Sequence, residues 1–205
     1  MDPASDIAFT PTVKAFQAER GSRASYARME ERGGFRTAIS DDLEAFLASI
    51  DTAYLATANS LGQPYAQHRG GPKGFIRRIG PGTLGFADFT GNKQYISTGN
   101  LAENDKAFLF LMDYASRRRI KLWGRARIES DPELVARLMP ADYSAKPEQA
   151  IVFEVDAWDI NCPQHIPQKV NATDVAKVIA DLETEIEKLE AENTALKSKL
   201  EGPNA

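Results

Sequence analysis

Short apolar runs separated by turns dominate the middle of the chain. Between positions 53 and 160 these runs are, in order, AYLATA, YAQHR, GFIRRIG, TLGFADF, KAFLFLMDY, RRIKLWGRARI and AIVFEVDAWDI. Their length and the Gly, Pro and Asn residues that bound them are typical of β-strands. Tight turns and short helices connect them, whereas parallel neighbours need longer crossovers, so the runs predict an antiparallel barrel of six or seven strands.

Helical patterns flank and interrupt these runs. Ser40 precedes Asp41, Asp42 and a set of apolar positions with helical spacing, which predicts a capped helix that ends near Ser49. The stretch DPELVARLM predicts a second short helix that begins at a proline. Residues 1–39 are polar and predict an arm with short helical pieces, to which no chemistry can be assigned.

A heptad repeat runs through the last part of the chain. Positions labelled d hold Val175, Leu182, Leu189 and Leu196, and positions labelled a hold Ile179, Ile186, Asn193 and Leu200. This seam predicts a parallel two-stranded coiled coil, in which a buried Asn193 favours two strands and one register. Across such a dimer Glu192 can pair with Lys197, whereas Glu185 and Glu190 repel. The alternative is a lone amphipathic helix packed on its own barrel.

Charge is distributed unevenly. The 205 residues carry a formal net charge of −4, yet residues 66–127 hold 12 Lys and Arg against 4 Asp and Glu. A basic centre in an acidic chain favours a small bound anion over nucleic acid, because duplex-binding domains usually carry a basic excess throughout. No apolar run is long enough to span a membrane and the start lacks a signal-peptide pattern, so we expect a cytoplasmic protein without membrane association.

The stretch GFADFTGNKQYISTGNL, residues 85–101, passes from a strand to a helix through a turn that carries a cation, amides and hydroxyls. Such a turn can cradle an anion at a helix N-terminus, and an ordinary solvated turn is the alternative. A dianionic phosphate needs charge-assisted donors, which Arg69, Lys93 and Arg119 could supply. The candidates for a flat apolar wall, or for ordinary core positions, are Phe86, Tyr95 and Trp123.

Three blocks of the sequence resemble the FMN-binding split-barrel family typified by pyridoxamine 5′-phosphate oxidase. They are GQPYAQHRGGP, GFADFTGNKQYISTGNLAENDKAFLFLMD and RRRIKLWGRA, in the order and spacing of that family, and the likeness continues less distinctly into FEVDAWDINCPQHIP. The resemblance implies a mainly β fold with short helices, built as a six-stranded antiparallel split β-barrel. It also implies a homodimer with two FMN molecules bound between the subunits. The expected organisation is an arm at 1–39, a barrel domain at 40–172 and a coiled-coil segment at 173–205.

Matched block by block, the resemblance implies a set of cofactor-binding residues. They are Gln67, His68, Arg69, Gly70 and Gly71 on one strand, Ala87, Asp88, Asn92, Lys93 and Gln94 around the turn, and Arg118 and Arg119 further on, with Trp123 added as an aromatic candidate. Family members often have Ser-Arg-Lys where this turn reads Asn-Lys-Gln, which leaves one cation instead of two. Arg118 and Arg119 are the candidates to compensate.

The segment NCPQHIP follows the last run. Cys162 and His165 lie on a Pro-broken loop without a third ligand, so we expect neither a metal site nor a nucleophile there. We expect the loop to reach the pocket of its own or a neighbouring subunit, where His165 could contact substrate or the flavin ring. The Arg and His pair that grips substrate in the vitamin oxidase has no counterpart here, so oxidation of vitamin B6 is not expected.

Together these patterns predict an FMN-binding homodimer that acts as an oxidoreductase, passing hydride or electrons through FMN to or from an unidentified small molecule. No catalytic acid or base can be named. The alternative is a non-catalytic sensor or interaction protein that binds flavin, haem or a deazaflavin and docks a partner through its coiled coil.

Overall fold

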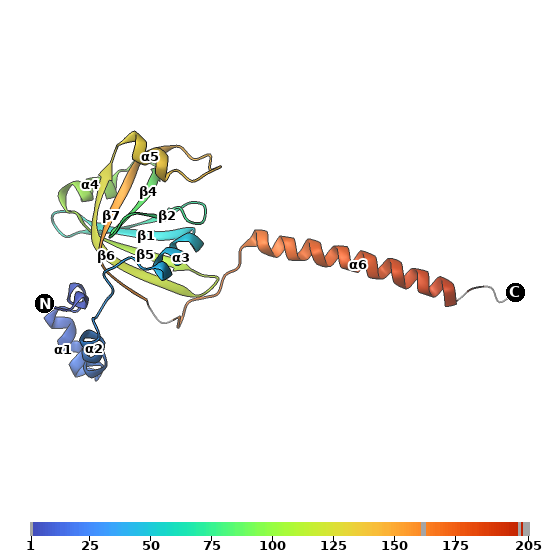
Figure 1. The fold of residues 1–205 in the computed structure, drawn as a ribbon, viewed down its shortest axis with the longest axis horizontal. Coiled ribbons are helices and arrows are strands. Elements are labelled where there is room, and N and C mark those ends of the chain that lie inside the picture. Colours follow the sequence, from blue (N-terminus) through green and yellow to red (C-terminus); the bar gives the residue numbers. More distant parts are fainter. Residues whose placement is uncertain (1, 161–162, 201, 203–205) are drawn as a thin grey trace. The chain divides into compact units, whose positions relative to one another are not determined.

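The seven apolar runs form one antiparallel sheet in the computed structural model, which describes residues 2–160, 163–200 and 202. The strands are β1 (Thr52–Ala58), β2 (Pro64–Gly70), β3 (Arg77–Gly80), β4 (Thr83–Phe89), β5 (Lys106–Asp113), β6 (Arg118–Glu129) and β7 (Pro147–Ile160). Their order across the sheet is β2-β1-β5-β6-β7-β4-β3, and all neighbours are antiparallel (Figure 1). The fold is mainly β as predicted, but the described residues form seven strands where the resemblance implied six. The short β3 pairs with β4 alone.

Burial follows the two-residue period of the strands. In β1 alternate positions are buried and the positions between them are half-buried, because one face packs on the main core. By contrast, the middle five positions of β4 are all buried. Leu84 and Phe86 join the main core, whereas Ala87 faces a second cluster that contains Leu138. The strand that leads into the turn at residues 90–95 is therefore held on both faces.

Three helices accompany the sheet: α3 (Asp41–Ser49), α4 (Ile96–Glu103) and α5 (Pro132–Leu138). The predicted cap of α3 is confirmed, because Ser40 Oγ accepts a hydrogen bond from Leu43 N at 3.4 Å. The predicted helix that begins at a proline is α5, where an Asp131 oxygen accepts from Glu133 N at 3.1 Å. Both caps satisfy a backbone donor that the first turn of a helix leaves without a partner.

The N-terminal residues form η1 (Ala4–Ile7), α1 (Pro11–Glu19) and α2 (Arg23–Glu31). After α2 the chain returns to the sheet. The Phe35 ring stacks on Trp123 of β6 with centroids 5.0 Å apart, and Trp158 Nε1 of β7 donates a hydrogen bond to Ala38 O at 2.8 Å. The end of this segment is therefore attached to β6 and β7 by an aromatic stack and a buried indole hydrogen bond.

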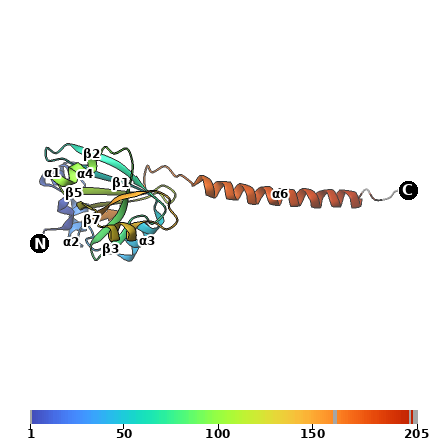
Figure 2. The same ribbon diagram turned by 90° about the horizontal axis from the view of Figure 1, so that it is seen from above.

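The chain divides into two compact units, and residues 167–205 with 114–116 form the second. Its main element is the 29-residue helix α6 (Ala172–Leu200), which Figure 2 shows as one continuous rod. No residue of α6 is buried. In the described part of the chain, no helix combines the length and the apolar character needed to cross a membrane.

Gly124 provides a test of the sheet. It lies at a register shift in the pairing of β6 with β7, and a Cβ atom there would overlap the carbonyl oxygen of Glu154. We expect Gly124→Ala to lower the free energy of unfolding by about 2 kcal/mol or more, because the opposing backbone must move. Gly82→Ala is the matched control, since a Cβ there meets nothing within 4 Å. Urea denaturation of both variants measures the difference, and equal stabilities would contradict the crowding at Gly124.

Candidate functional site

Side chains bridge the gap between the two ends of the sheet. The strand β2 forms one edge, and β4 lies next to the other edge. Arg69 on β2 forms an ion pair with Asp88 on β4 through Nη1 and Oδ1. Gln149 on β7 donates a further hydrogen bond from Nε2 to Asp88 Oδ2 at 2.9 Å. Among the described residues no backbone ladder joins β2 to β4, so these side chains connect the two edges where the barrel is split.

The turn at residues 90–95 begins where β4 ends. Thr90 N donates to Lys146 O at 2.9 Å, and Asn92 Oδ1 accepts from Gln94 N at 3.2 Å. Lys93 and Tyr95 have left-handed backbones, with φ of 57° and 51°. Few residues other than glycine adopt this conformation, so the turn holds an uncommon shape beside the Arg69 and Asp88 pair.

The N-terminus of α4 lacks a side-chain cap. Tyr95 occupies the capping position without a side-chain hydrogen bond to the helix, whereas Ser40 caps α3 and Asp131 caps α5. The first N–H groups of a helix have no partner within it, and the helix dipole places partial positive charge there. This end of α4 can therefore donate hydrogen bonds to an anion.

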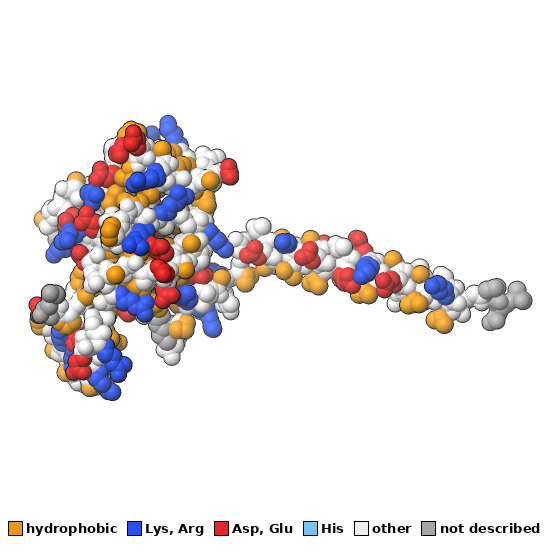
Figure 3. Space-filling model, viewed as in Figure 1, with side chains coloured by type: hydrophobic (Ala, Val, Ile, Leu, Met, Phe, Trp, Pro, Cys, Tyr) orange, Lys and Arg blue, Asp and Glu red, His pale blue; other side chains and the backbone are white. Residues whose placement is uncertain are grey.

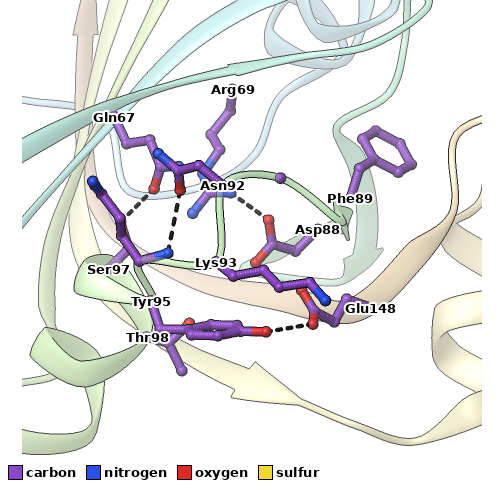
Figure 4. Close-up of a pocket in the computed structure, with 12 residues that line it drawn as sticks. Gln67, Arg69, Asp88, Phe89, Asn92, Lys93, Tyr95, Ser97, Thr98 and Glu148 are labelled. Carbon is purple, nitrogen blue, oxygen red and sulfur yellow. Dashed lines mark hydrogen bonds and ion pairs between the residues drawn. The ribbon is translucent and has the colours of Figure 1, made fainter.

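Two adjoining cavities lie between β2, β4 and this turn, and Figure 4 shows the residues that line the first of them. The first, which we call the turn cavity, is lined by Gln67, Arg69, Asp88, Phe89, Gly91, Asn92, Lys93, Gln94, Tyr95, Ser97, Thr98 and Glu148. The second, which we call the strand cavity, is lined by Gln67, His68, Arg69, Gly70, Phe75, Phe86, Ala87, Asp88 and Phe89. The turn cavity is mainly polar, whereas three phenylalanines give the strand cavity an apolar wall. Four shared residues make them one continuous site.

Hydrogen bonds arrange the polar side chains of the turn cavity. Ser97 Oγ donates to Gln67 Oε1 at 2.9 Å, and Gln149 Nε2 approaches Thr98 Oγ1 at 3.1 Å. Tyr95 Oη donates to Glu148 Oε1 at 2.7 Å (Figure 4), which raises the pKa of the Tyr95 hydroxyl above its ordinary value. The hydroxyl therefore stays protonated at neutral pH, and Glu148 already accepts its single proton.

Two cations and two carboxylates line the turn cavity. Arg69 is paired with Asp88, and both side chains are largely buried, with 13% and 10% exposed. Arg69 Nε is buried and has no hydrogen-bond partner among the described residues. Lys93 is exposed and forms no ion pair in the described part of the chain, and Figure 4 shows its side chain extending toward Glu148. Lys93 is therefore the cation of this cavity that an incoming anion could engage without first displacing a carboxylate.

The structure brings nine of the residues proposed from the sequence to these cavities. They are Gln67, His68, Arg69, Gly70, Ala87, Asp88, Asn92, Lys93 and Gln94. Gly71 lines neither cavity, and its N–H donates to Asp51 O at 3.3 Å. Trp123 also lies outside both, because its ring packs between Phe35 and Phe108.

The two arginines proposed as compensating cations lie elsewhere in the sheet. Arg118 and Arg119 begin β6, and β1 and β5 separate that strand from β2. The Arg118 guanidinium sits over the Phe46 ring, 5.1 Å from its centroid, and Arg119 Nε is buried with no hydrogen-bond partner among the described residues. His165 is exposed with a φ of 62° and lines neither cavity, and Cys162 lies outside the described residues.

Sequence reasoning missed several residues of the site. Glu148 and Gln149 begin β7, far along the chain from the turn, and both reach it because Gln149 pairs with Asp88 in the register of β4 and β7. Ser97 and Thr98 lie in the first turn of α4. Two adjacent hydroxyl residues at a helix start were the sequence feature that could have identified them as site residues. Nothing in the local sequence of PEQAIVF indicated contact with residue 88.

The fold and the site define an antiparallel split-barrel protein with two adjoining cavities at the split, one of which has a wall of phenylalanines. Residues 39–162 match the sequence profile of the family described as pyridoxamine 5′-phosphate oxidase, and the chain belongs to this family. The expected family resemblance is confirmed. No curated protein matches the chain.

Solved structures with a similar fold have low sequence identity. HupZ from Group A Streptococcus is 16% identical with a TM-score of 0.49, covering 64% of this chain and 99% of its own. An FMN-binding protein from Syntrophomonas wolfei is 13% identical with a TM-score of 0.46, covering 71% and 97%. An F420 reductase is 20% identical with a TM-score of 0.41, covering 57% and 94%.

Proposed function

We propose that this protein binds FMN at the joined cavities and transfers hydride or electrons through it. The observation that carries the proposal is the uncapped N-terminus of α4, which meets Lys93 and the Ser97 and Thr98 hydroxyls in one polar cavity. Backbone amides, a cation and hydroxyls are the donors that a phosphate group requires. The adjoining strand cavity supplies an apolar wall from Phe75, Phe86 and Phe89, which suits a flat aromatic ring.

Each part of the chain would have a separate role toward the cofactor. Lys93 and the first N–H groups of α4 would hold the phosphate, and Gln67 and Asp88 would offer polar atoms where the two cavities join. FMN would supply the redox chemistry, accepting and returning hydride or electrons. The residues described here bind and orient the group, and the apolar wall excludes water from one of its sides.

The ion pair of Arg69 with Asp88 reduces the positive charge that the turn cavity offers to a phosphate. Because Asp88 neutralises Arg69, Lys93 is the main uncompensated cation in the turn cavity. Arg118 and Arg119 line neither cavity of their own chain, so they could add positive charge beside the phosphate only from a second subunit. We propose that the barrel forms a dimer with this arrangement. Sedimentation of the protein at micromolar concentration tests that dimer directly.

Titration of the apoprotein tests the cofactor. We expect the purified protein to be yellow, to release about one FMN per chain on denaturation, and to bind FMN more tightly than riboflavin, because only FMN carries the phosphate. Riboflavin, a deazaflavin and haem are the comparison ligands in the same titration. Equal affinity for FMN and riboflavin, or tighter binding of haem or the deazaflavin, would overturn the assignment.

A second candidate function is a non-catalytic sensor that uses α6 to dock another protein, and the exposed apolar positions of α6 favour it. Reduction of the bound cofactor by a nicotinamide donor, followed by turnover of an acceptor, separates the two. An enzyme reoxidises in repeated cycles, whereas a sensor is reduced once per bound cofactor.

A further inference from the structure

The helix α6 exposes a continuous apolar stripe. Side chains at Ile179, Leu182, Ile186, Leu189 and Leu196 are each about half exposed or more, and Figure 3 shows apolar atoms along one edge of the helix. The groove at Asn193 is lined by Ile186, Leu189, Glu190, Thr194 and Lys197, all from α6 itself. Most of the stability of a helix in water comes from packing an amphipathic face, so a stripe of this length requires a partner.

The choice of residues along the stripe fits a second copy of the same helix. Isoleucine at two a positions with leucine at three d positions is the pattern that favours two parallel strands. Asn193 occupies the a position between Ile186 and Leu200, and its side chain forms no hydrogen bond among the described residues. In a parallel pair it meets the partner's Asn193, and the two amides can bond to each other.

An antiparallel pair would leave that amide without such a match. In that arrangement each a position faces a d position, so alignment of the whole seam places Asn193 against the partner's Leu182. Burying an amide against leucine leaves its donors and acceptor unsatisfied, at a cost of about 1–3 kcal/mol. The polar layer therefore favours the parallel arrangement.

Charges beside the seam favour the same arrangement. In a parallel pair Glu192 lies near the partner's Lys197, an attraction that occurs twice by symmetry. Glu185 lies near the partner's Glu190, and Lys188 of its own helix, 3.7 Å from Glu185, weakens repulsion at Glu185 equally in either orientation. In an antiparallel pair Glu185 would face the partner's Glu192, and Glu183 would face the partner's Glu190, with no attraction in return.

We infer that α6 pairs with α6 of a second copy of this chain as a parallel two-stranded coiled coil, in register at Asn193. The pairing rests on the helix alone and does not depend on what the barrel binds. It gives the protein a second contact between copies, separate from any contact between barrels.

Cysteine cross-linking of the full chain tests the orientation. In a Cys162→Ser background, Leu196→Cys places one thiol per chain at a d position, where the parallel pair brings it beside the thiol at the same position of the partner. We expect most of the oxidised protein to migrate as a covalent dimer. Ser198→Cys, on the outer face of the same turn, is the matched control and should remain monomeric on the gel.

Antiparallel pairing predicts a different product. Position 196 would then face position 179 of the partner, so Leu196→Cys alone would stay uncross-linked, while mixing it with Ile179→Cys would give a mixed dimer. That result would overturn the parallel arrangement. Absence of every cross-link would show that α6 packs on its own chain or on another protein, and would overturn the pairing itself.

A charge reversal gives a second, independent readout. Lys197→Glu turns two attractions of the parallel pair into repulsions. In glutathione buffer, the effective concentration of the two thiols introduced by Leu196→Cys should therefore fall about tenfold. Lys199→Glu makes the same change in the same turn without a charged counterpart in the parallel register, and should change that value by less than about threefold. Equal effects of the two reversals would contradict the register.

Discussion

Replacing Lys93 with alanine is expected to weaken FMN binding by about ten- to a hundredfold, while riboflavin binding stays nearly unchanged. A charge-assisted hydrogen bond contributes roughly 1.5–3 kcal/mol, and Lys93 is the cation in the turn cavity that no carboxylate of the described residues already engages. Riboflavin lacks the phosphate and should lose almost nothing. Fluorescence titration of the apoprotein with both ligands measures the two dissociation constants.

Lys106→Ala is the control for this experiment. It removes the same charge from an exposed position at the start of β5, outside both cavities, so neither ligand should bind differently. A comparable loss in Lys93→Ala and Lys106→Ala would indicate a long-range charge effect. Equal losses of FMN and riboflavin in Lys93→Ala would show that this turn does not hold the phosphate.

Replacing Arg69 with methionine is expected to lower the free energy of unfolding by about 3 kcal/mol. The change leaves the largely buried Asp88 carboxylate without its cation, and an uncompensated buried charge is strongly destabilising. Gln149 still donates one hydrogen bond to Asp88, which keeps the expected loss at the lower end of the range for such pairs. Urea denaturation of the ligand-free protein measures it.

Two further variants make this result specific. Arg78→Met removes an arginine whose pair with Glu44 is 39% and 42% exposed, and should cost less than about 1 kcal/mol. Adding Asp88→Asn to Arg69→Met should recover most of the loss, because no charge then remains buried. If Arg69→Met costs no more than Arg78→Met, the pair does not hold the two edges of the barrel together.

The contrast between these two cations changes how the site is understood. The sequence indicated Arg69 and Lys93, with Arg119, as phosphate donors, because a phosphate needs charge-assisted donors and the family resemblance pointed to these positions. In the structure Arg69 forms an ion pair with Asp88, so its main role is structural. To bind a phosphate as well, Arg69 would have to contact Asp88 and the phosphate at the same time. Titrating Arg69→Met beside Lys93→Ala compares the two roles in one assay.

Local signals were sufficient wherever the causes are local. The cap at Ser40, the end of α3 at Ser49 and the helix that begins at Pro132 depend on residues within one or two turns, and all three appear as predicted. The short apolar runs likewise predicted the strands, because the Gly, Pro and Asn residues that bound them mark the turns where strands end. The turn at residues 90–95 was recognised for the same reason, since its polar side chains lie next to one another in the chain.

The register of the sheet could not be predicted from local sequence. The contacts of Glu148 with Tyr95 and of Gln149 with Asp88 join residues more than fifty positions apart, and only the pairing of β4 with β7 brings them together. The same pairing order places β7 between β4, which leads into the turn, and β6, which carries Arg118 and Arg119. Neither fact is visible in the residues near those positions.

The sequence by itself determined the family, the antiparallel strands, the capped helices and the heptad seam of α6, because each depends on neighbouring residues or on a fixed period along the chain. The tertiary structure decided the number of strands in the sheet, the pairing of Arg69 with Asp88 and the membership of the two cavities. The physical reason is that a strand can pair with several others at similar local cost. Burial of the shared core selects one arrangement, and that arrangement determines which distant side chains meet.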